Sequence, residues 1–411
     1  MNIAILYQVK EPPQVGNIRK PMKEGGYSDS GSDLAYELKK KGYNLITPVE
    51  NPDEKNNIDW VFGDDEEGIT KAINMGADVL WLNTVLYDGH PIEKYIGKVK
   101  VIGQKCSDVQ TYDDKYYTNH ILLEHGLDIV NDVSVKSADE YNGDFPCVIK
   151  PIRGRGSQGV SVIENKEQLD KVINKLVADK IYGSEFMIEP YLDGDEITVA
   201  VFPADSEHKK PYCLPPVSRF NHQNGIAPYS GKVAVSENSK AVENIEEYTD
   251  IMNNCEKAYE ILGLKAPIRI DCRKNKDGKY LMFDVNMKPN MTMATRVHRQ
   301  NQDSLMMLAA EKAGLRAASE VFADRAYQAD GSLVPRKLPG AVIHNKDEAI
   351  ARTVRMVTEG KVTAITGEEV EIAAHSICVH GDNPSAVEFV KNIRTQLTAR
   401  GVEIAPIREI V

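Results

Sequence analysis

The chain has 411 residues, 42% of them hydrophobic, which is enough for about two to four domains with sizeable cores. Its formal net charge of −11 argues against a nucleic-acid-binding surface, although a nucleotide site needs only a few local cations. The six cysteines are scattered without a CxxC pair, which indicates reduced core residues of a cytoplasmic protein. The opening MNIAILYQ is strand-like and no long apolar stretch follows, so we expect neither a signal peptide nor a membrane span.

The first 105 residues alternate strand-like and helical patterns. Apolar strand runs lie at 2–7, 44–49, 78–83 and 98–103, and helical patterns lie at 32–43 and near 66–76. This alternation favours an α/β domain with an open parallel sheet. The Pro-, Gly- and Lys-rich stretch 11–31 has little periodicity, and both a disordered segment and a functional lid remain open for it.

Residues 106–192 follow a different pattern. A helix over 113–126 precedes a strand–turn–strand unit, FPCVIKPIRGRGSQGVSVI at 145–163, and a further strand, EFMIEPYL at 185–192. A glycine-rich hairpin can bring backbone N–H groups close to phosphate oxygens, and Lys150 adds positive charge beside it. Because glycine-rich turns also occur without a ligand, this unit alone does not establish a phosphate site.

The stretch 268–286, IRIDCRKNKDGKYLMFDVN, predicts a β-hairpin. A two-residue turn at Asp277-Gly278 gives the pairs Lys276 with Lys279, Asp271 with Asp284 and Arg269 with Asn286. Alternation then gives one face Ile268, Ile270, Leu281, Phe283 and Val285, and the other Arg269, Asp271, Asp284 and Asn286.

The two opposed carboxylates of this hairpin repel each other and destabilise a bare sheet. A divalent cation reverses that sign, and two carboxylates with an amide oxygen form a fitting ligand set for Mg²⁺. The alternative is a solvated polar face that happens to carry two acids.

The tail, 318–411, predicts a strand–helix–strand–helix–strand series. We expect strands at 339–344, 371–382 and 402–407, and helices at 346–360 and 383–401. Asp382 or Asn383 before Pro384 is a helix-start signal directly after a strand.

Four motifs in the central part resemble, in the same order, those of the ATP-grasp superfamily, most closely its D-alanine–D-alanine ligase-like branch. They are DDKYYT at 113–118, VIKP with RGRGSQG at 148–159, MIEPYLDGDE at 187–196, and RID…DVNMKPNMT at 269–292. The resemblance covers residues 106–310. It implies an α/β protein, α+β in the ATP-grasp part, with a preATP-grasp Rossmann-like domain at 1–105, a small ATP-grasp lobe at 106–192 and a large lobe at 193–314.

The resemblance also implies roles for single residues. ATP would be held at its phosphates by Lys115, Lys150 and Ser157, with Ser157 and its neighbouring backbone covering the β- and γ-phosphates, and at adenine and ribose by Glu189, Tyr191, Leu192 and Glu196. The metal, Mg²⁺ or Mn²⁺, would be bound by Asp271, Asp284 and Asn286. Arg269 would face the reacting acyl group.

Three departures from the family pattern leave the substrate open. Asp284 stands in place of a glutamate, which shortens the arm and can favour one metal ion over two. Asn290 stands in place of a glycine near the expected tetrahedral intermediate. The N-terminal substrate motif GG-x-S-x-E-x-x-V-S is absent, since the first strand continues into QVKEPPQVGNIRKP. Arg219 is a candidate for binding a substrate carboxylate, with an ordinary structural arginine as the alternative.

The implied activity is that of an ATP-dependent carboxylate–amine ligase acting through an acylphosphate. Its partners would be ATP and small carboxylate and amine substrates, with no nucleic acid and no membrane, in a cytoplasmic homodimer. Two alternatives remain: a protein acting in 5-oxoproline hydrolysis, and a non-catalytic ATP-binding protein.

The tail carries a second resemblance. SEVFADRAYQADGSLVPRKLPGAVIH…GKV…SICVHGDNPSA is similar to the C-terminal part of the LamB/YcsF family of 5-oxoprolinase subunits, over about 315–405. That family forms a modified β/α barrel, so the resemblance implies a partial, barrel-like fragment at 315–411. His380 is either a retained active-site residue or a satisfied strand-end histidine. Because a partial sheet leaves open edges, we expect the tail to pack on the ATP-grasp body or on a second copy of it.

Overall fold

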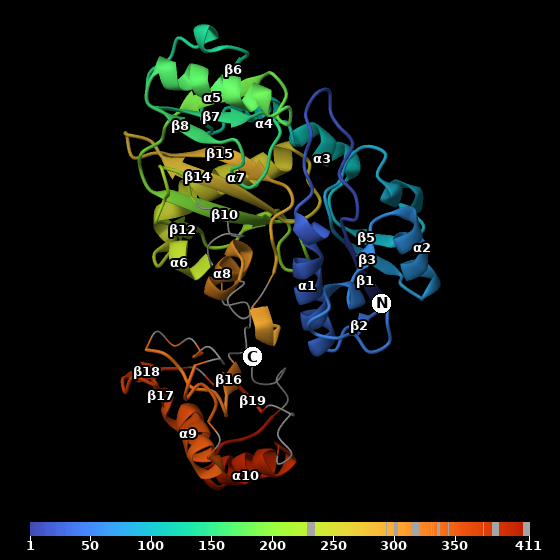
Figure 1. The fold of residues 1–411 in the computed structure, drawn as a ribbon, viewed down its shortest axis with the longest axis vertical. Coiled ribbons are helices and arrows are strands. Elements are labelled where there is room, and N and C mark those ends of the chain that lie inside the picture. The colour runs from blue at the N-terminus through green and yellow to red at the C-terminus, as the bar shows by residue number, and fades with distance from the viewer. Residues whose placement is uncertain are drawn as a thin grey trace. The chain divides into compact units, whose positions relative to one another are not determined.

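The computed structural model describes residues 1–227, 235–292, 294–299, 303–313, 320–329, 331, 333–334, 338–343, 345–372, 374–379 and 386–405. The chain divides into two compact units, Met1–Ala313 and Gly314–Val411 (Figure 1). Within the described residues, no helix combines the length and apolar character needed to cross a membrane.

The N-terminal domain is built on a parallel sheet of order β2-β1-β4-β5, with β3 also paired to β1. Its strands are β1 (Asn2–Tyr7), β2 (Asn44–Leu45), β3 (Phe62–Gly63), β4 (Val79–Asn83) and β5 (Lys100–Ile102). Its helices are η1 (Glu24–Tyr27), α1 (Ser28–Lys40), η2 (Asn57–Asp59), α2 (Glu66–Asn74), η3 (Pro91–Tyr95) and α3 (Cys106–Tyr112).

The two faces of β1 are covered by different helices, which lie on opposite sides of the sheet in Figure 1. Leu6 packs in one buried cluster with Ile69 of α2, whereas Ile5 packs in another with Ala35 of α1. Successive strand residues point to opposite faces, so this fully apolar run serves both layers. The predicted open parallel sheet is confirmed.

The stretch 11–31 is held in place rather than extended freely. Ile18 forms an antiparallel bridge to Tyr182, and the amide of Arg19 donates to the carbonyl of Ile181 at 2.7 Å. α1 begins at Ser28, four residues before the predicted start.

The small lobe is an antiparallel sheet of order β6-β9-β7-β8. Its elements are α4 (Lys115–Glu124), β6 (Val133–Val135), η4 (Ala138–Glu140), β7 (Cys147–Pro151), β8 (Ser161–Ile163), α5 (Lys166–Ala178) and β9 (Phe186–Pro190). Cys147 and Ile149 of β7 pack in one core with Leu169 of α5, while Val148 and Lys150 line the cavity described below. Alternation along β7 therefore aims Lys150 at the site.

The large lobe is an antiparallel sheet of order β13-β12-β10-β14-β15, with β11 paired to β10. Its strands are β10 (Glu196–Phe202), β11 (Tyr212–Cys213), β12 (Val217–Arg219), β13 (Ser239–Ala241), β14 (Ile268–Lys274) and β15 (Tyr280–Asn286). Its helices are α6 (Val235–Asn238), η5 (Ile245–Tyr248), α7 (Thr249–Ile261), η6 (Val297–Arg299) and α8 (Leu305–Lys312).

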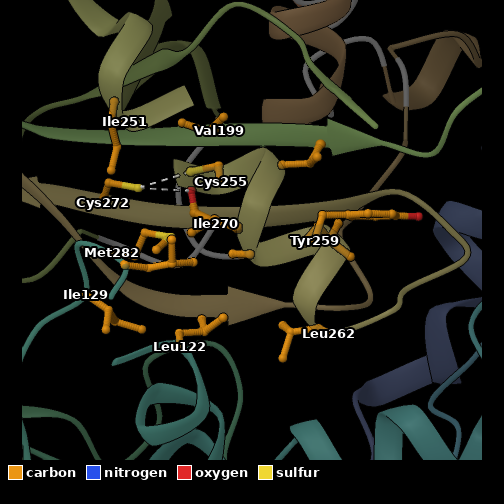
Figure 2. Packing of buried hydrophobic residues seen from close by; sticks show 14 of the residues in the cluster. Leu122, Ile129, Val199, Ile251, Cys255, Tyr259, Leu262, Ile270, Cys272 and Met282 are labelled. Carbon is orange, nitrogen blue, oxygen red and sulfur yellow. Dashed lines mark hydrogen bonds between the residues drawn. The ribbon is translucent and has the colours of Figure 1, made fainter. Parts of the chain in front are cut away.

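One face of the large-lobe sheet is sealed by α7. Figure 2 shows Cys255 of α7 directed at Cys272 of β14, with the two sulfur atoms 3.9 Å apart in the fully buried core. Burial raises the pKa of both thiols, so they behave as small apolar residues rather than as nucleophiles. With one face sealed in this way, the polar residues of β10 and β14 fall on the opposite face.

The hairpin prediction was right at the site and wrong at the turn. Arg269 pairs with Asn286 and Asp271 with Asp284, as predicted, but the register then shifts and Lys274 pairs with Tyr280. The tip is one residue longer, because the amide of Asn275 donates to the carbonyl of Lys279 and Gly278 alone takes a positive φ of 80°.

A β-bulge at Phe283 absorbs this extra residue and re-sorts the faces of β15. Tyr280 and Met282 enter the core in place of the predicted Leu281 and Phe283, and Phe283 lines the cavity instead. Strict alternation failed because the bulge inserts one residue between two otherwise regular halves of the strand.

The described residues of the tail unit form two small sheets and two helices. Its elements are β16 (Glu320–Phe322), α9 (Lys346–Glu359), β17 (Lys361–Thr363), β18 (Glu369–Glu371), β19 (Ser376–Cys378) and α10 (Ala386–Ala399). β16 and β19 pair in parallel, β17 and β18 form a hairpin, and both helices contribute to one core, with Ile350 and Phe389.

This arrangement differs from the predicted series. Residues 339–343 and 402–405 carry no strand in the described part of the chain, and no barrel is formed by its described strands. His380, Asp382, Asn383 and Pro384 lie outside the described residues.

Candidate active site

The sequence-predicted site residues line one cavity of about 320 Å³ in the first unit. The set is Lys115, Lys150, Ser157, Glu189, Tyr191, Leu192, Glu196, Arg219, Arg269, Asp271, Asp284, Asn286 and Asn290. They come from both lobes and the loop after β15, and residues of α1 and β4 complete the wall. The structure thus brings together residues up to 175 positions apart (115 to 290).

One buried and one partly buried ion pair hold the predicted phosphate-binding lysines. Lys150 Nζ lies 2.7 Å from Glu189 Oε2 and donates to the Phe283 carbonyl at 2.8 Å. Lys115, at the first turn of α4, pairs with Asp284. Burial favours neutral Glu189 and raises its pKa against the opposing charge of Lys150. Both lysines are therefore aimed at the cavity by side chains from other strands.

The opposed acids Asp271 and Asp284 are each matched with a cation. Arg269 donates to both oxygens of Asp271, from Nε at 3.1 Å and Nη2 at 3.0 Å, in a bidentate pair. Burial alone would raise the pKa of Asp284, but Lys115, Lys150 and Arg269 together hold that pKa below its usual value. The like-charge repulsion expected from the register is thus balanced within the site.

The donor set of Asp271, Asp284 and Asn286 fits a hard divalent cation. Two carboxylates and an amide oxygen supply oxygen ligands only, which suits Mg²⁺ or Mn²⁺. Among the described residues, no group of three or more His, Cys, Asp and Glu side chains is arranged for a metal, so the amide and the phosphates of a nucleotide would complete the coordination.

Glu196, which also lines the cavity, is buried and lies near three basic residues. His222 Nε2 lies 2.8 Å from Glu196 Oε2, Arg273 Nη1 lies 3.9 Å away, and Arg219 is its register partner on β12. Arg273 also packs on the Tyr191 ring, 4.9 Å from its centroid. Burial lowers the pKa of Arg219, which nevertheless stays a cation because an arginine titrates far above neutral pH.

The glycine-rich loop connects β7 to β8 and carries a tight turn. Gly156 and Ser157 both have positive φ, 59° and 57°, which is uncommon for serine. Arg155 Nη1 donates to the hydroxyl of Tyr27 at 3.2 Å. The loop therefore touches the N-terminal domain across the cavity.

Sequence reasoning missed Lys288 and Tyr27. Lys288 Nζ lies 3.5 Å from the Tyr27 ring centroid and 3.3 Å from Asn83 Oδ1. Burial and the nearby charges of Lys23, Arg155 and Lys20 lower the pKa of Lys288 to about 7. The sequence signal that could have identified Lys288 is its position two residues after the predicted metal ligand Asn286.

The full N-terminal substrate motif is absent, as predicted, but its first part occurs after the loop that follows β1. Residues 25–28 read GGYS, the first four positions of that motif, and Ser30 stands where the motif has glutamate. A Cβ on Gly26 would lie 1.7 Å from the Gln8 carbonyl oxygen, and the amide of Gln8 donates to the Gly26 carbonyl at 2.9 Å. The insertion after β1 moved the motif away from the strand end, where it was sought.

A parallel-sheet domain and two antiparallel lobes that line one polar cavity make up an ATP-grasp fold. Residues 109–309 match the family model described as the D-ala D-ala ligase C-terminus, and residues 286–411 match that of the LamB/YcsF family. The chain therefore joins a ligase-type ATP-grasp segment to a LamB/YcsF segment, and both resemblances inferred from the motifs are confirmed.

Solved structures agree with this fold. D-alanine–D-alanine ligase from Bacillus anthracis, complexed with ATP, has a TM-score of 0.50 at 19% identity and covers 76% of this chain and 97% of its own. The VanG D-Ala:D-Ser ligase from Enterococcus faecalis has a TM-score of 0.50 at 16% identity and covers 75% and 99%. At these identities the likeness establishes the fold alone.

Curated relatives match the tail segment. A 5-oxoprolinase subunit from Fusobacterium nucleatum is 54% identical over 108 residues, 26% of this chain and 42% of the relative. The 5-oxoprolinase subunit of the same name from Coprothermobacter proteolyticus is 46% identical over 140 residues, 32% and 54%. The chain thus spans only about half the length of these relatives.

Proposed function

We propose that the chain is an ATP-dependent carboxylate–amine ligase that forms an amide bond through an acylphosphate. The observation that carries this proposal is the cavity itself, in which Lys115, Lys150 and the opposed acids Asp271 and Asp284 meet the glycine-rich loop. Phosphoryl transfer depends on positioning and charge neutralisation, which this convergence of lysines, acids and loop would supply.

In the proposed reaction, a substrate carboxylate oxygen attacks the γ-phosphorus of ATP. The bond from that phosphorus to the bridging oxygen breaks, releasing ADP and leaving an acylphosphate. The amine nitrogen then attacks the acyl carbon, loses a proton, and phosphate departs. Two easier steps thus replace one very unfavourable attack on a carboxylate.

The chain's residues would assist at defined points. Lys115 and Lys150 would exchange Asp284 and Glu189 for phosphate oxygens, and Arg269 would stabilise the oxyanion formed at the acyl carbon. Ser157 and its loop would exclude water from the acylphosphate. A divalent cation on Asp271, Asp284 and Asn286 would offset the phosphate charge.

The ligase proposal is tested by measuring ADP release from ATP with Mg²⁺ and a panel of carboxylates and amines. We expect release only when both substrate types are present, with one amide formed per ADP. Lys150→Met should abolish nucleotide binding, because it removes a buried cation. Lys166→Met is the matched control, since Lys166 is an exposed lysine of the same lobe that pairs with Asp139.

The tail supports a second candidate, ATP-driven hydrolysis of 5-oxoproline. If 5-oxoproline alone stimulates ADP release, the ligase proposal fails. If ATP binds and no substrate stimulates turnover, a non-catalytic role replaces both. We also propose a cytoplasmic homodimer, which light scattering tests by a solution mass twice that of one chain.

A further inference from the structure

The cavity contains a second cationic group besides the one proposed for the phosphates. Lys288 and Arg155 both contact Tyr27: Lys288 Nζ lies 3.5 Å from its ring centroid, and Arg155 donates to its hydroxyl at 3.2 Å. Lys288 also donates to Asn83 Oδ1 at 3.3 Å, and both cations line the cavity wall.

Arg155 and Lys288 differ from three other lysines of the cavity in their ion pairing. Lys20 pairs with Asp113, Lys115 with Asp284 and Lys150 with Glu189. Within the described ranges, neither Arg155 nor Lys288 has a carboxylate in ion-pair contact. Both side chains are partly buried, and two basic groups side by side without a counter-ion favour an anion in this part of the cavity.

The neighbouring polar groups are matched or neutral, and they are fixed in orientation. The amide nitrogen of Asn83 donates to the Tyr27 carbonyl at 2.9 Å and to Ser30 Oγ at 3.1 Å, which turns its oxygen towards Lys288. Ser30, at the motif position of a glutamate, brings no negative charge to this wall. The nearby acid Asp29 is already paired with two other cations. A ligand ammonium group would therefore gain little here, whereas an anion would meet two basic side chains.

We propose that Lys288 and Arg155 bind an anionic side chain of the co-substrate, so that one of the joined molecules is an acidic amino acid. This inference rests on the proposed ligase function. The contacts of Lys288 are with the N-terminal domain, while Lys115 and Lys150 contact the two ATP-grasp lobes. The co-substrate is therefore a better source of the anion than the nucleotide.

Calorimetry on the full chain, saturated with Mg²⁺ and ADP, tests the proposal with both enantiomers of glutamate and aspartate against glutamine and asparagine. We expect at least one acid to bind about tenfold or more tightly than its amide, the size of a charge-assisted hydrogen bond. Lys288→Met should remove this preference and Lys288→Arg should keep it. Lys39→Met is the matched control, because Lys39 lies over the Trp60 ring outside the cavity, at 5.5 Å.

Three results would overturn the proposal: equal binding of acids and amides, no binding of any acid, or a preference that survives in Lys288→Met. A loss of ATP affinity relative to ADP in Lys288→Met, with the acid preference unchanged, would assign the lysine to the terminal phosphate. If the acid preference holds while no substrate pair releases ADP, the anion site stands and the ligase function fails.

Discussion

Replacement of Asp33 should strongly destabilise the first unit. Its side chain is fully buried and accepts from Arg296 Nε at 2.6 Å, from Arg299 Nε at 2.8 Å and from the hydroxyl of Thr292. These donors follow the predicted metal residue Asn286 in sequence, so one carboxylate of α1 fixes the loop that ends the cavity.

Asp33→Asn keeps the volume but leaves the fully buried Arg296 guanidinium without a counter-ion. Removing one partner of a buried pair costs about 3–5 kcal/mol, and no water reaches Arg296 to offset it. With a urea slope of about 3 kcal/mol per M, the unfolding midpoint should fall by about 1–1.7 M. The exposed pair of Arg19 and Glu11 supplies the control, because Glu11→Gln should leave the unfolding midpoint nearly unchanged.

Tryptophan fluorescence is a suitable signal, because the only two tryptophans of the chain, Trp60 and Trp81, both lie in the N-terminal domain. The double variant Asp33→Asn with Arg296→Gln should lose less than the sum of the two single variants, since each single change strands the other group. A midpoint for Asp33→Asn within the range of the Glu11 control would refute the argument.

Three further predictions concern the site. Asp271→Asn should slow ADP release by about 10²–10³-fold and leave the unfolding midpoint nearly unchanged; comparable losses in both would indicate a structural acid pair. Gly26→Ala should lower the melting temperature, measured by calorimetry, well beyond the control variant Gly42→Ala. Both glycines have positive φ, but only at Gly26 would a Cβ clash with a carbonyl, that of Gln8. Chelation with EDTA should stop ADP release and added Mg²⁺ or Mn²⁺ should restore it; turnover in excess EDTA would reject the metal site.

The ATP and metal residues of the site could be predicted from the sequence because each lies within a short motif. Asp271 and Asp284 were paired correctly from a turn assumption, although the turn was one residue too short. Two errors cancelled at that point: the longer tip shifted the register by one, and the bulge at Phe283 shifted it back. Local patterns cannot separate these cases, because a bulge changes the facing of a strand without changing its composition.

Residues that act through tertiary contacts were the ones missed. Lys288 and Tyr27 are 261 positions apart, and neither carries a spacing that predicts their contact. The tail was predicted as a regular series because 339–343 and 402–405 are apolar enough for strands. In the structure, however, Val342 makes only an isolated bridge to Arg325. A strand needs a partner over several residues, and the partner is not encoded in the run itself.

The bulge has a consequence for how the two lobes work together. Phe283, which the register shift leaves without a partner on β14, accepts a hydrogen bond at its carbonyl from Lys150 of the small lobe. Lys150 also pairs with Glu189 of β9. A single lysine therefore contacts both the hairpin with the two acids and a strand with an expected adenine contact. Phosphate binding at Lys150 would therefore change its contacts with both lobes. The irregularity that broke the alternation pattern thus adds a contact between the two lobes at the site.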